Sequence, residues 1–461
     1  MMGQLTSRSA PLHPLAGKRV VVLAGPTAVG KSALAMRLCE VLHGELISVD
    51  SVQVYRNLQI GANKPSASER SRVRHHLLDV RDPTEEYTAG AFYKDALHAV
   101  ESVLSRGNLP VLVGGTSMYM RWLTSGRPDA PKAEPAVVER VRALLAPHEA
   151  ASDWSGGLEH LINVDPSRAA QLSKNDWYRL HRALTVALQT EQPVGSLATP
   201  ADPDGLDALR DALDMRCFFL SAPREPLCRR IDERCEAMLT GGLLEETNEQ
   251  LLTGSLLPSS PAGRAIGYRQ TLTYLTRPDW KPSDAHAFSE YVRDFTAASR
   301  RYAGQQVKWF RSEARFEWVA SDWDAPERAE KTLLERVQCE RADFDAGLVA
   351  PAQSELRALE PNLDKLMKTY MPRLPSTIDD AKALGEMLAR ADACREKLQP
   401  TLPALLEKDG ELAERFPYHR REKEPGVDEQ VVATEGGGDR EAGEGEAESV
   451  GQKRRKDSER P

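Results

Sequence analysis

The chain has 461 residues, enough for about two or three domains, and carries a formal net charge of −8. The acidity lies late in the chain: residues 1–319 hold 38 lysines and arginines against 37 aspartates and glutamates, whereas residues 320–461 hold 23 against 32. The overall charge therefore does not exclude a nucleic-acid partner. No run of about 18 apolar residues occurs, so we expect no membrane-spanning helix.

Cysteine usage and the N-terminus bear on the compartment. The six cysteines show neither the paired spacing of a structural zinc site nor the density of a disulfide framework. This pattern is typical of a reducing compartment, and we expect a cytoplasmic protein. Residues 1–18 contain no acidic residue and lack the apolar stretch of a secretory signal, so we expect a flexible start. The same composition leaves an organellar address, in a plastid or mitochondrion, open.

Strands and helices alternate in the first part of the chain. This alternation predicts an α/β fold whose core is a doubly wound parallel sheet. Ligands of such sheets lie at the carboxyl ends of the strands, where a glycine-rich segment, Asp50 and Thr116 arrive. In chain order we predict a strand over 18–25, a helix over 32–44, a strand over 45–50, a helix over 89–107 and a strand over 108–116.

The strand pattern stops near residue 126 and resumes with a strand over 215–222. In the interval we predict a small helical domain in which Arg179 and Arg182 share one basic helix face. A long helix over about 285–311 follows, and then amphipathic helices and a tail rich in Glu and Gly. The predicted domains are a flexible N-terminus at 1–18, a P-loop core at 19–125 and 191–319, a helical insertion at 126–190, a helical extension at 320–421 and a disordered acidic tail at 422–461.

GPTAVGKS, at residues 25–32, matches the phosphate-binding pattern G-x-x-x-x-G-K-[ST]. The match is specific because the segment follows a predicted strand and opens a predicted helix. Backbone N–H groups at a helix N-terminus favour an anion, the lysine adds a positive charge, and the serine hydroxyl can ligate Mg²⁺. We expect a diphosphate or longer ligand, bound by Gly25, Thr27, Ala28, Val29, Gly30, Lys31 and Ser32, with Ser32 as the metal ligand.

The other strand ends carry weaker signals. Asp50 opens the polar segment DSVQVYR and suits a metal ion, a second substrate or the cap of the next helix. VGGTSMY, at 113–119, places two glycines and the hydroxyl of Thr116 at the next strand end. His75 and His76 are adjacent but have no evident third ligand, so we do not expect a metal there.

Three segments interleave arginine, glutamine and aromatic residues: the helix near 176–190, GRAIGYRQ at 263–270 and RRYAGQQVKWFR at 300–311. This mixture suits contacts to phosphates together with base stacking. Any one of the segments would be typical of a solvated helix face. Three of them in a chain with a phosphate loop favour RNA as a partner.

In their order, these segments resemble the tRNA dimethylallyltransferase (tRNA isopentenyltransferase) family over about residues 19–311. The resemblance implies transfer of a dimethylallyl group from dimethylallyl diphosphate to the exocyclic N6 amine of the adenosine directly 3′ of the anticodon in certain tRNAs. We therefore expect Mg²⁺ as cofactor, the anticodon stem-loop as partner, and a monomer. The motifs that carry the resemblance are GPTAVGKS, ELISVDSVQVYR, IGANKP, HHLLD, YTAGAF, VGGTSMY, NDWYRLHRAL, GLLEE, AIGYRQ and RRYAGQQVKWF.

The resemblance also implies roles for single residues. Asp50 would take the proton of the amine, Thr116 would hold a substrate oxygen or the amine, and Lys31 would stabilise the diphosphate. Arg234 resembles an arginine that clamps the diphosphate, with Arg229 and Arg230 as alternatives. Contacts to tRNA are expected at Asp50, Ser51, Val52, Gln53, Thr116, Arg179, Arg182, Arg264, Gly267, Tyr268, Arg269, Lys308, Trp309 and Arg311, with Gln53 reading an adenine edge.

The chain departs from the family pattern, and two other functions stay open. Gly304-Gln305-Gln306 stands where the family usually has Lys-Arg-Gln, so we expect weaker and less salt-dependent RNA binding. No C-terminal zinc finger is present, because Cys339 and Cys394 have no partners at finger spacing. The alternatives are an adenylate isopentenyltransferase of cytokinin synthesis and a P-loop kinase. The basic segments favour tRNA, and VLVGGT lacks the terminal aspartate expected of a kinase.

Overall fold

The computed structural model describes residues 14–126, 133–193, 205–358, 376–405 and 409. The predicted disordered tail at 422–461 and most of the predicted flexible N-terminus lie outside these residues. Within them, no helix combines the length and apolar character needed to cross a membrane.

One sheet of six parallel strands forms the core, in the order β3-β2-β4-β1-β5-β6. Its central strand β1 reads RVVVLA and is buried along almost its whole length, as expected of a parallel strand with helices on both faces. The predicted doubly wound α/β fold is confirmed. The strands are β1 Arg19–Ala24, β2 Gly44–Val49, β3 His75–His76, β4 Leu109–Gly114, β5 Asp214–Ser221 and β6 Glu317–Ala320.

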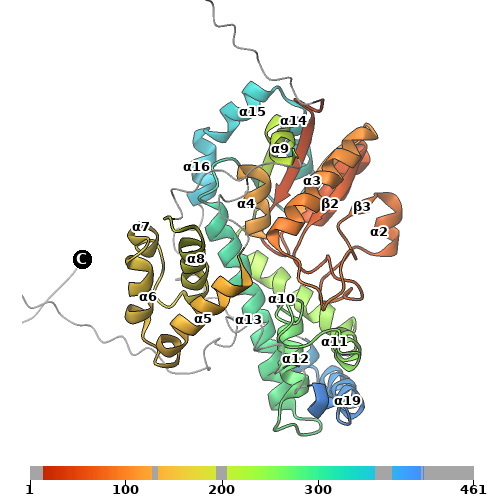
Figure 1. Ribbon diagram of the computed structural model, residues 1–461. Helices are drawn as coiled ribbons and strands as arrows, with labels where there is room; N and C mark the ends of the chain where they lie inside the picture. Colours follow the sequence, from red (N-terminus) through yellow and green to blue (C-terminus); the bar gives the residue numbers. More distant parts are fainter. Residues whose placement is uncertain (1–13, 127–132, 194–204, 359–375, 406–408, 410–461) are drawn as a thin grey trace, which may run out of the picture. The chain divides into compact units, whose positions relative to one another are not determined.

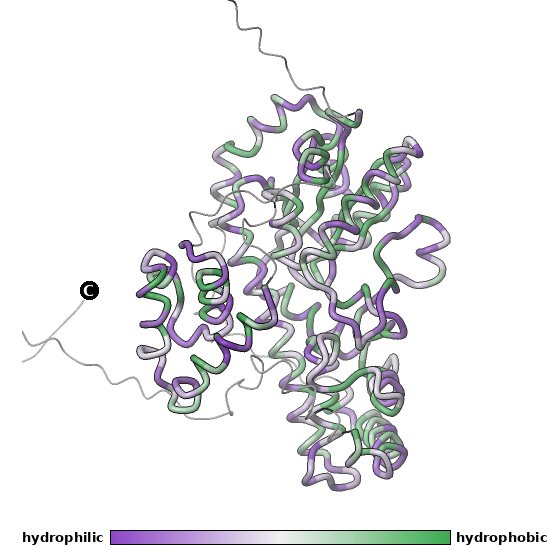
Figure 2. The backbone as a smooth tube through the Cα atoms, in the orientation of Figure 1, coloured by the Kyte–Doolittle hydropathy of each residue, from purple (hydrophilic) through white to green (hydrophobic). Residues whose placement is uncertain are grey.

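Helices connect the strands and carry the rest of the core. Figure 2 shows hydrophobic and hydrophilic residues alternating around them, as expected of helices with one buried face. The 26-residue helix α13 packs against α4, α10, α12 and α19 (Figure 1). The bounds are α1 Lys31–Leu42, α2 Ala67–Arg72, α3 Ala89–Ser105, α4 Ser117–Ser125, α9 Leu206–Ala212, α10 Arg224–Thr240, α11 Leu243–Leu252, α12 Tyr268–Thr276 and α13 Ala285–Phe310.

The inserted segment forms its own small helical core, in which Val141, Leu145, Leu161, Leu180 and Leu184 are buried together. Three of its helices are preceded by an aspartate whose side chain accepts a hydrogen bond from a backbone N–H of the first turn. That N–H has no partner within the helix, so the aspartate caps it. The helices are α5 Pro135–Ala150, α6 Trp154–Ile162, α7 Pro166–Ala169 and α8 Trp177–Thr190.

The predicted boundary at 319 falls inside β6, the edge strand that pairs with β5, so the segment that follows continues directly from the sheet. Leu333 of α14 and Leu398 of α19 belong to the same buried cluster as the strands. Arg390 of α19 forms an ion pair with Glu245 of α11 at 2.5 Å. The helices of this part are α14 Pro326–Gln338, α15 Arg341–Leu348, α16 Pro351–Ala358, α18 Ser376–Asp379 and α19 Ala381–Leu398.

Gly61 is a position where the fold tolerates no side chain. A Cβ there would lie 2.5 Å from Cζ of Tyr268, whose ring is fully buried. We expect Gly61→Ala to lower the free energy of unfolding by about 1–3 kcal/mol, because the ring has no room to move. Gly385→Ala is the matched control, since a Cβ there meets nothing within 4 Å in helix α19 and should stabilise by about 0.5–1 kcal/mol. Urea unfolding measures both; equal stability of the two variants would contradict the prediction.

Candidate active site

A cavity of about 480 Å³ lies at the carboxyl ends of β1, β2 and β4. This is the edge of the sheet where the sequence predicts ligands. The lining residues come from the glycine loop, the segment after β2, the end of β4 and the turn after it, helices α10 and α13, and the segments that precede α3 and α12. The polar side chains among them are Thr27, Lys31, Ser32, Asp50, Ser51, Gln53, Tyr55, Asn63, Tyr87, Thr116, Arg234, Arg264, Ser299, Tyr302 and Gln306.

A second cavity, of about 540 Å³, is lined partly by residues at the amino ends of β1 and β5 and also contains arginines. Arg210 pairs with Asp211 and Arg341 pairs with Asp345, while Arg315 donates to the backbone oxygen of Thr124. Carboxylates therefore neutralise two of these three arginines, and none of the predicted site residues lines this cavity. The cavity at the carboxyl ends is therefore the candidate active site.

The glycine loop joins the end of β1 to the start of α1. Gly25 packs closely under β5, since a Cβ there would lie 2.9 Å from the backbone oxygen of Leu220. Ala28 and Gly30 adopt positive φ angles of 66° and 102°, which turn the chain into the helix. Gly30 is the N-cap of α1 and supplies no side-chain cap, so the N-terminus of this helix remains available to an anion.

Two cationic side chains meet at this loop. Nζ of Lys31 donates to the backbone oxygens of Gly25 and Pro26, at 2.8 and 2.7 Å. Burial lowers the pKa of Lys31 to about 7, the charge of Arg234 acts in the same direction, and the charge of Asp50 opposes it. Arg234 donates to the hydroxyl of Thr27 at 2.7 Å, and burial lowers its pKa as well. Two crowded cations in a buried place favour the binding of a multiply charged anion.

The structure distinguishes Arg234 from its sequence neighbours. Arg229 forms an ion pair with Glu225 on the exposed side of α10. The guanidinium of Arg230 lies over the ring of Trp323, 4.9 Å from its centroid. Of the three arginines predicted as clamps, only Arg234 lines the cavity.

The pKa of Lys31 predicts a pH dependence of anion binding. Below pH 7 the amine is already charged, whereas above pH 7 a bound diphosphate must recruit a proton to it. We expect the affinity for an organic diphosphate to fall by up to about tenfold for each pH unit between 7 and 9. Calorimetry over this range, compared with Lys31→Arg, measures the effect, because the arginine stays charged and should remove most of the slope. Equal slopes for the two proteins would contradict the assignment.

Asp50 follows β2 and is held in a turn. Its Oδ1 accepts the backbone N–H groups of Val52 and Gln53, at 2.8 and 3.2 Å. The next helix, α2, begins only at Ala67 and is capped by Ser66, so the interpretation of Asp50 as a helix cap is wrong. The turn fixes the carboxylate at the cavity and leaves its other oxygen for a substrate or an ion.

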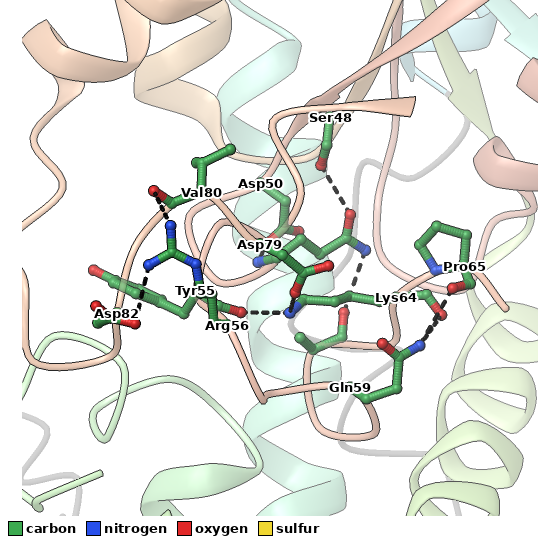
Figure 3. Close-up of polar contacts among 12 residues, drawn as sticks. Ser48, Asp50, Tyr55, Arg56, Gln59, Lys64, Pro65, Asp79, Val80 and Asp82 are labelled. Carbon is green, nitrogen blue, oxygen red and sulfur yellow. Dashed lines mark hydrogen bonds and ion pairs between the residues drawn. The ribbon is translucent and has the colours of Figure 1, made fainter. Parts of the chain in front are cut away.

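The segment after Asp50 is held in place by polar contacts (Figure 3). Gln53 accepts the hydroxyl of Ser48 at 2.8 Å and donates to the backbone oxygens of Ala62 and Asn63, at 3.3 and 3.1 Å. Both N–H groups of Gln53 are engaged, so an adenine contact would use the second lone pair of its Oε1 or replace one of these bonds. The amide therefore shapes the cavity wall in the structure described here.

The motifs IGANKP and HHLLD support this wall. Nζ of Lys64 is buried and contacts both the backbone oxygen of Tyr55 and, at 2.6 Å, the carboxylate of Asp79 (Figure 3). His75 and His76 instead bond the backbone oxygen of Val73 and the carboxylate of Glu45, each at 2.7 Å. Among the described residues no three potential metal-ligating side chains cluster.

Two side chains of α13 that sequence reasoning missed, Tyr302 and Gln306, line the cavity together with Thr116. Oγ1 of Thr116 accepts the backbone N–H of Ser51 at 3.2 Å. Gln306, one turn after Tyr302, accepts the backbone N–H of Thr27 and donates to the backbone oxygen of Gly115, both at 2.9 Å. The signal was the Tyr-x-x-x-Gln spacing, which places both side chains on one helix face.

The predicted RNA-contacting residues divide by exposure. Arg179, Ser51 and Lys308 are exposed, and Val52, Arg182, Arg264, Arg269, Trp309 and Arg311 are half-buried. The prediction for Tyr268 is wrong, because its side chain is 0% exposed and its hydroxyl bonds Glu246 at 2.6 Å and the N–H of Ala62 at 3.2 Å. Gly267 is buried as well and caps α12 with a positive φ of 98°. With its ring buried, Tyr268 cannot stack on a base in this structure, and the RNA contact of Gly267 stays a prediction.

Comparisons with known proteins agree on one family. The family model described as IPP transferase matches residues 53–313. tRNA dimethylallyltransferase 9 of Arabidopsis thaliana is 40% identical over 349 residues, covering 70% of this chain and 74% of that protein. tRNA dimethylallyltransferase of Protochlamydia amoebophila is 37% identical over 317 residues, which cover 67% of this chain and 86% of that protein. A crystal structure of a eukaryotic dimethylallyltransferase acting on tRNA superposes with a TM-score of 0.57 at 25% identity. The match covers 75% of this chain and 85% of that protein.

Proposed function

The chain belongs to the IPP transferase family, and from this premise we propose that it is a prenyltransferase acting on tRNA. It transfers a dimethylallyl group from dimethylallyl diphosphate to the N6 amine of the adenosine directly 3′ of the anticodon and releases diphosphate. The observation that carries the proposal is a single cavity lined by two chemically different groups of residues, which we assign as its two ends. One group is the glycine loop with Lys31 and Arg234, and the other is Asp50 with Thr116.

The first end suits the leaving group. When the allylic C–O bond breaks, the diphosphate keeps the electron pair and negative charge grows on its oxygens. The N-terminus of α1, the amine of Lys31 and the guanidinium of Arg234 are preorganised donors for that charge. Because the lysine already bonds two loop carbonyls, diphosphate binding exchanges these bonds for stronger, charge-assisted ones.

The second end suits the acceptor. An exocyclic adenine amine is a weak nucleophile, and it gains strength when a base removes its proton as the new C–N bond forms. Asp50 supplies such a base, held by its bonds to Val52 and Gln53. The adenosine leaves its stack to enter the cavity, at the cost of a few kcal/mol.

A magnesium ion fits the polar lining. The hydroxyl of Ser32 lines the cavity at the glycine loop and is a hard oxygen donor of the kind that Mg²⁺ prefers. This side chain would hold the ion together with the oxygens of the diphosphate. When bound there, the ion would neutralise part of the charge on the leaving group.

The exposed and half-buried cations would contact the anticodon stem-loop. Arg264 lines the cavity itself, while Arg179 and Lys308 present their charges to solvent. We also propose a monomeric enzyme in the cytoplasm; all six cysteines are free thiols, as a reducing compartment requires. Adenylate isopentenyltransferase and P-loop kinase remain the alternatives to be tested.

A labelled-substrate assay tests the proposal. Radiolabelled dimethylallyl diphosphate is incubated with the full chain and tRNA, with AMP, or with neither, and ATP consumption is followed in parallel. We expect label in tRNA and no ATP consumption. Label in AMP but not in tRNA would identify an adenylate isopentenyltransferase, and ATP consumption without prenyl transfer would identify a kinase.

A further inference from the structure

The motif GLLEE, at residues 242–246, has no role in the reaction as described above. It supplies the N-cap and first turn of α11, a helix that packs against α12 and α19. Its last residue, Glu246, is half-buried and contacts the segment at 59–61, which leads into the motif IGANKP. The carboxylate therefore joins two motifs that are far apart in the chain.

Four hydrogen-bond donors converge on this carboxylate. Its Oε2 accepts the backbone N–H groups of Gln59 and Ile60, at 2.7 and 2.8 Å. Its Oε1 accepts the backbone N–H of Gly61 at 3.0 Å and the phenol O–H of Tyr268 at 2.6 Å. A carboxylate offers about four lone-pair sites, so all of them are used. A glutamine of the same shape could not replace it, because its amide N–H bonds would point at donors.

The phenol of Tyr268 extends the network. It donates to Glu246 and accepts the backbone N–H of Ala62 at 3.2 Å, so the N–H groups of residues 59–62 are all held. Burial and the negative charge of Glu246 raise the pKa of Tyr268, as expected of a phenol that donates its proton. Tyr268 begins α12, directly after a segment whose residues 264–266 line the cavity. The network thus ties this segment to residues 61–63, which also line the cavity.

The loop held by Glu246 in turn supports the candidate base. The side-chain amide of Gln53 donates to the backbone oxygens of Ala62 and Asn63, at 3.3 and 3.1 Å. The backbone N–H of Gln53 donates to Oδ1 of Asp50 at 3.2 Å. A shift of the loop would therefore move both the cavity wall and the turn that fixes the carboxylate of Asp50.

Resting on the proposed function, we propose that Glu246 is a positioning residue for the acceptor: its four hydrogen bonds hold the wall and the Asp50 turn in the shape that receives the adenine. Glu246 acts through these segments and touches no substrate. A displacement of about 1 Å at a reacting group can cost about 10²-fold in rate, so the effect of its loss should be large. Diphosphate binding should not depend on it, because Lys31 and Arg234 are held by bonds within the glycine loop.

Glu246→Gln and its neighbour Glu245→Gln test this role in the full chain. We expect Glu246→Gln to lower kcat/KM for tRNA about 10- to 100-fold, while Kd for inorganic diphosphate, measured by calorimetry, changes by less than about twofold. Glu245→Gln is the matched control: Glu245 pairs with Arg390 on α19, away from the cavity wall, and its loss should change neither quantity by more than about twofold.

Tyr268→Phe is a second, milder variant, because it removes only the phenol oxygen from a ring that stays buried. It should lower kcat/KM for tRNA about threefold, again with Kd for diphosphate unchanged. If Glu246→Gln does not fold, Tyr268→Phe decides alone. Rates are normalised to the sites that bind diphosphate, so a partly unfolded variant does not distort the comparison.

An unchanged kcat/KM for tRNA in the folded variants would overturn the role of Glu246. So would an equal weakening of tRNA use and diphosphate binding, since the carboxylate would then support the whole site and not the acceptor end. A wild-type chain that binds diphosphate but transfers no label from dimethylallyl diphosphate to tRNA would instead overturn the proposed function, so the two failures are distinguishable.

Discussion

Replacing Asp50 with asparagine should slow prenyl transfer by about 10²–10⁴-fold while leaving tRNA binding within about twofold. The carboxylate is the candidate base of the acceptor end, and asparagine cannot take a proton from the amine. Asparagine does keep an oxygen that can accept from the N–H groups of Val52 and Gln53, so the turn after β2 should survive. Single-turnover transfer and gel-shift binding to the anticodon stem-loop measure the two effects separately.

Asp50→Ala and Asp322→Ala complete this test. Alanine removes both the base and the oxygen that accepts the N–H groups of the turn. The alanine variant should therefore transfer the prenyl group no faster than the asparagine variant. Asp322 is exposed outside the cavity, and its loss should leave transfer unchanged. If asparagine restored most of the activity lost with alanine, the role of Asp50 would be to hold the turn and not to take the proton.

Lys31→Ala should raise KM for dimethylallyl diphosphate and lower kcat, together reducing kcat/KM by about 10³-fold or more. Lys31 is the first residue of α1, and in the proposed reaction its amine would contact the diphosphate both before and during departure. KM for tRNA should change little, because the proposed role of Lys31 is to bind the diphosphate and not the RNA. Lys18→Ala is the control, since Lys18 is exposed just before β1 and outside the cavity.

Steady-state kinetics with each substrate varied in turn separate these effects. A Lys31→Ala enzyme with unchanged KM for the diphosphate would place that substrate elsewhere. A rise in KM for tRNA alone would assign the glycine loop to the RNA.

The central strands were predictable because they are continuous apolar runs ending in polar residues. For β2 and β4 the same pattern placed Asp50 and Thr116 at one edge of the sheet, where both line the cavity. Two strands escaped prediction for a physical reason. β3 is only His75–His76, and β6 is only four residues long, so neither offers a recognisable apolar period. Their positions come from pairing with neighbouring strands.

The site contacts that were missed join residues far apart in the chain. Gln306 bonds the N–H of Thr27 across 279 positions, and nothing in the local sequence of either residue indicates the bond. Tyr268 shows the opposite error: an aromatic beside Arg269 suggests RNA stacking, but the ring is buried under Gly61. Motif order identified the family correctly, while burial decides which motif residues can reach a ligand.

Nucleoside analysis of a modified tRNA tests the central claim most directly. An unmodified tRNA with adenosine directly 3′ of its anticodon is incubated with the chain, Mg²⁺ and dimethylallyl diphosphate, then digested and mapped by mass spectrometry. The account predicts one dimethylallyl group on that adenosine and none when guanosine replaces it. The account would be contradicted if folded protein left the tRNA unmodified. It would also be contradicted if the dimethylallyl group were found only on adenosines at other positions.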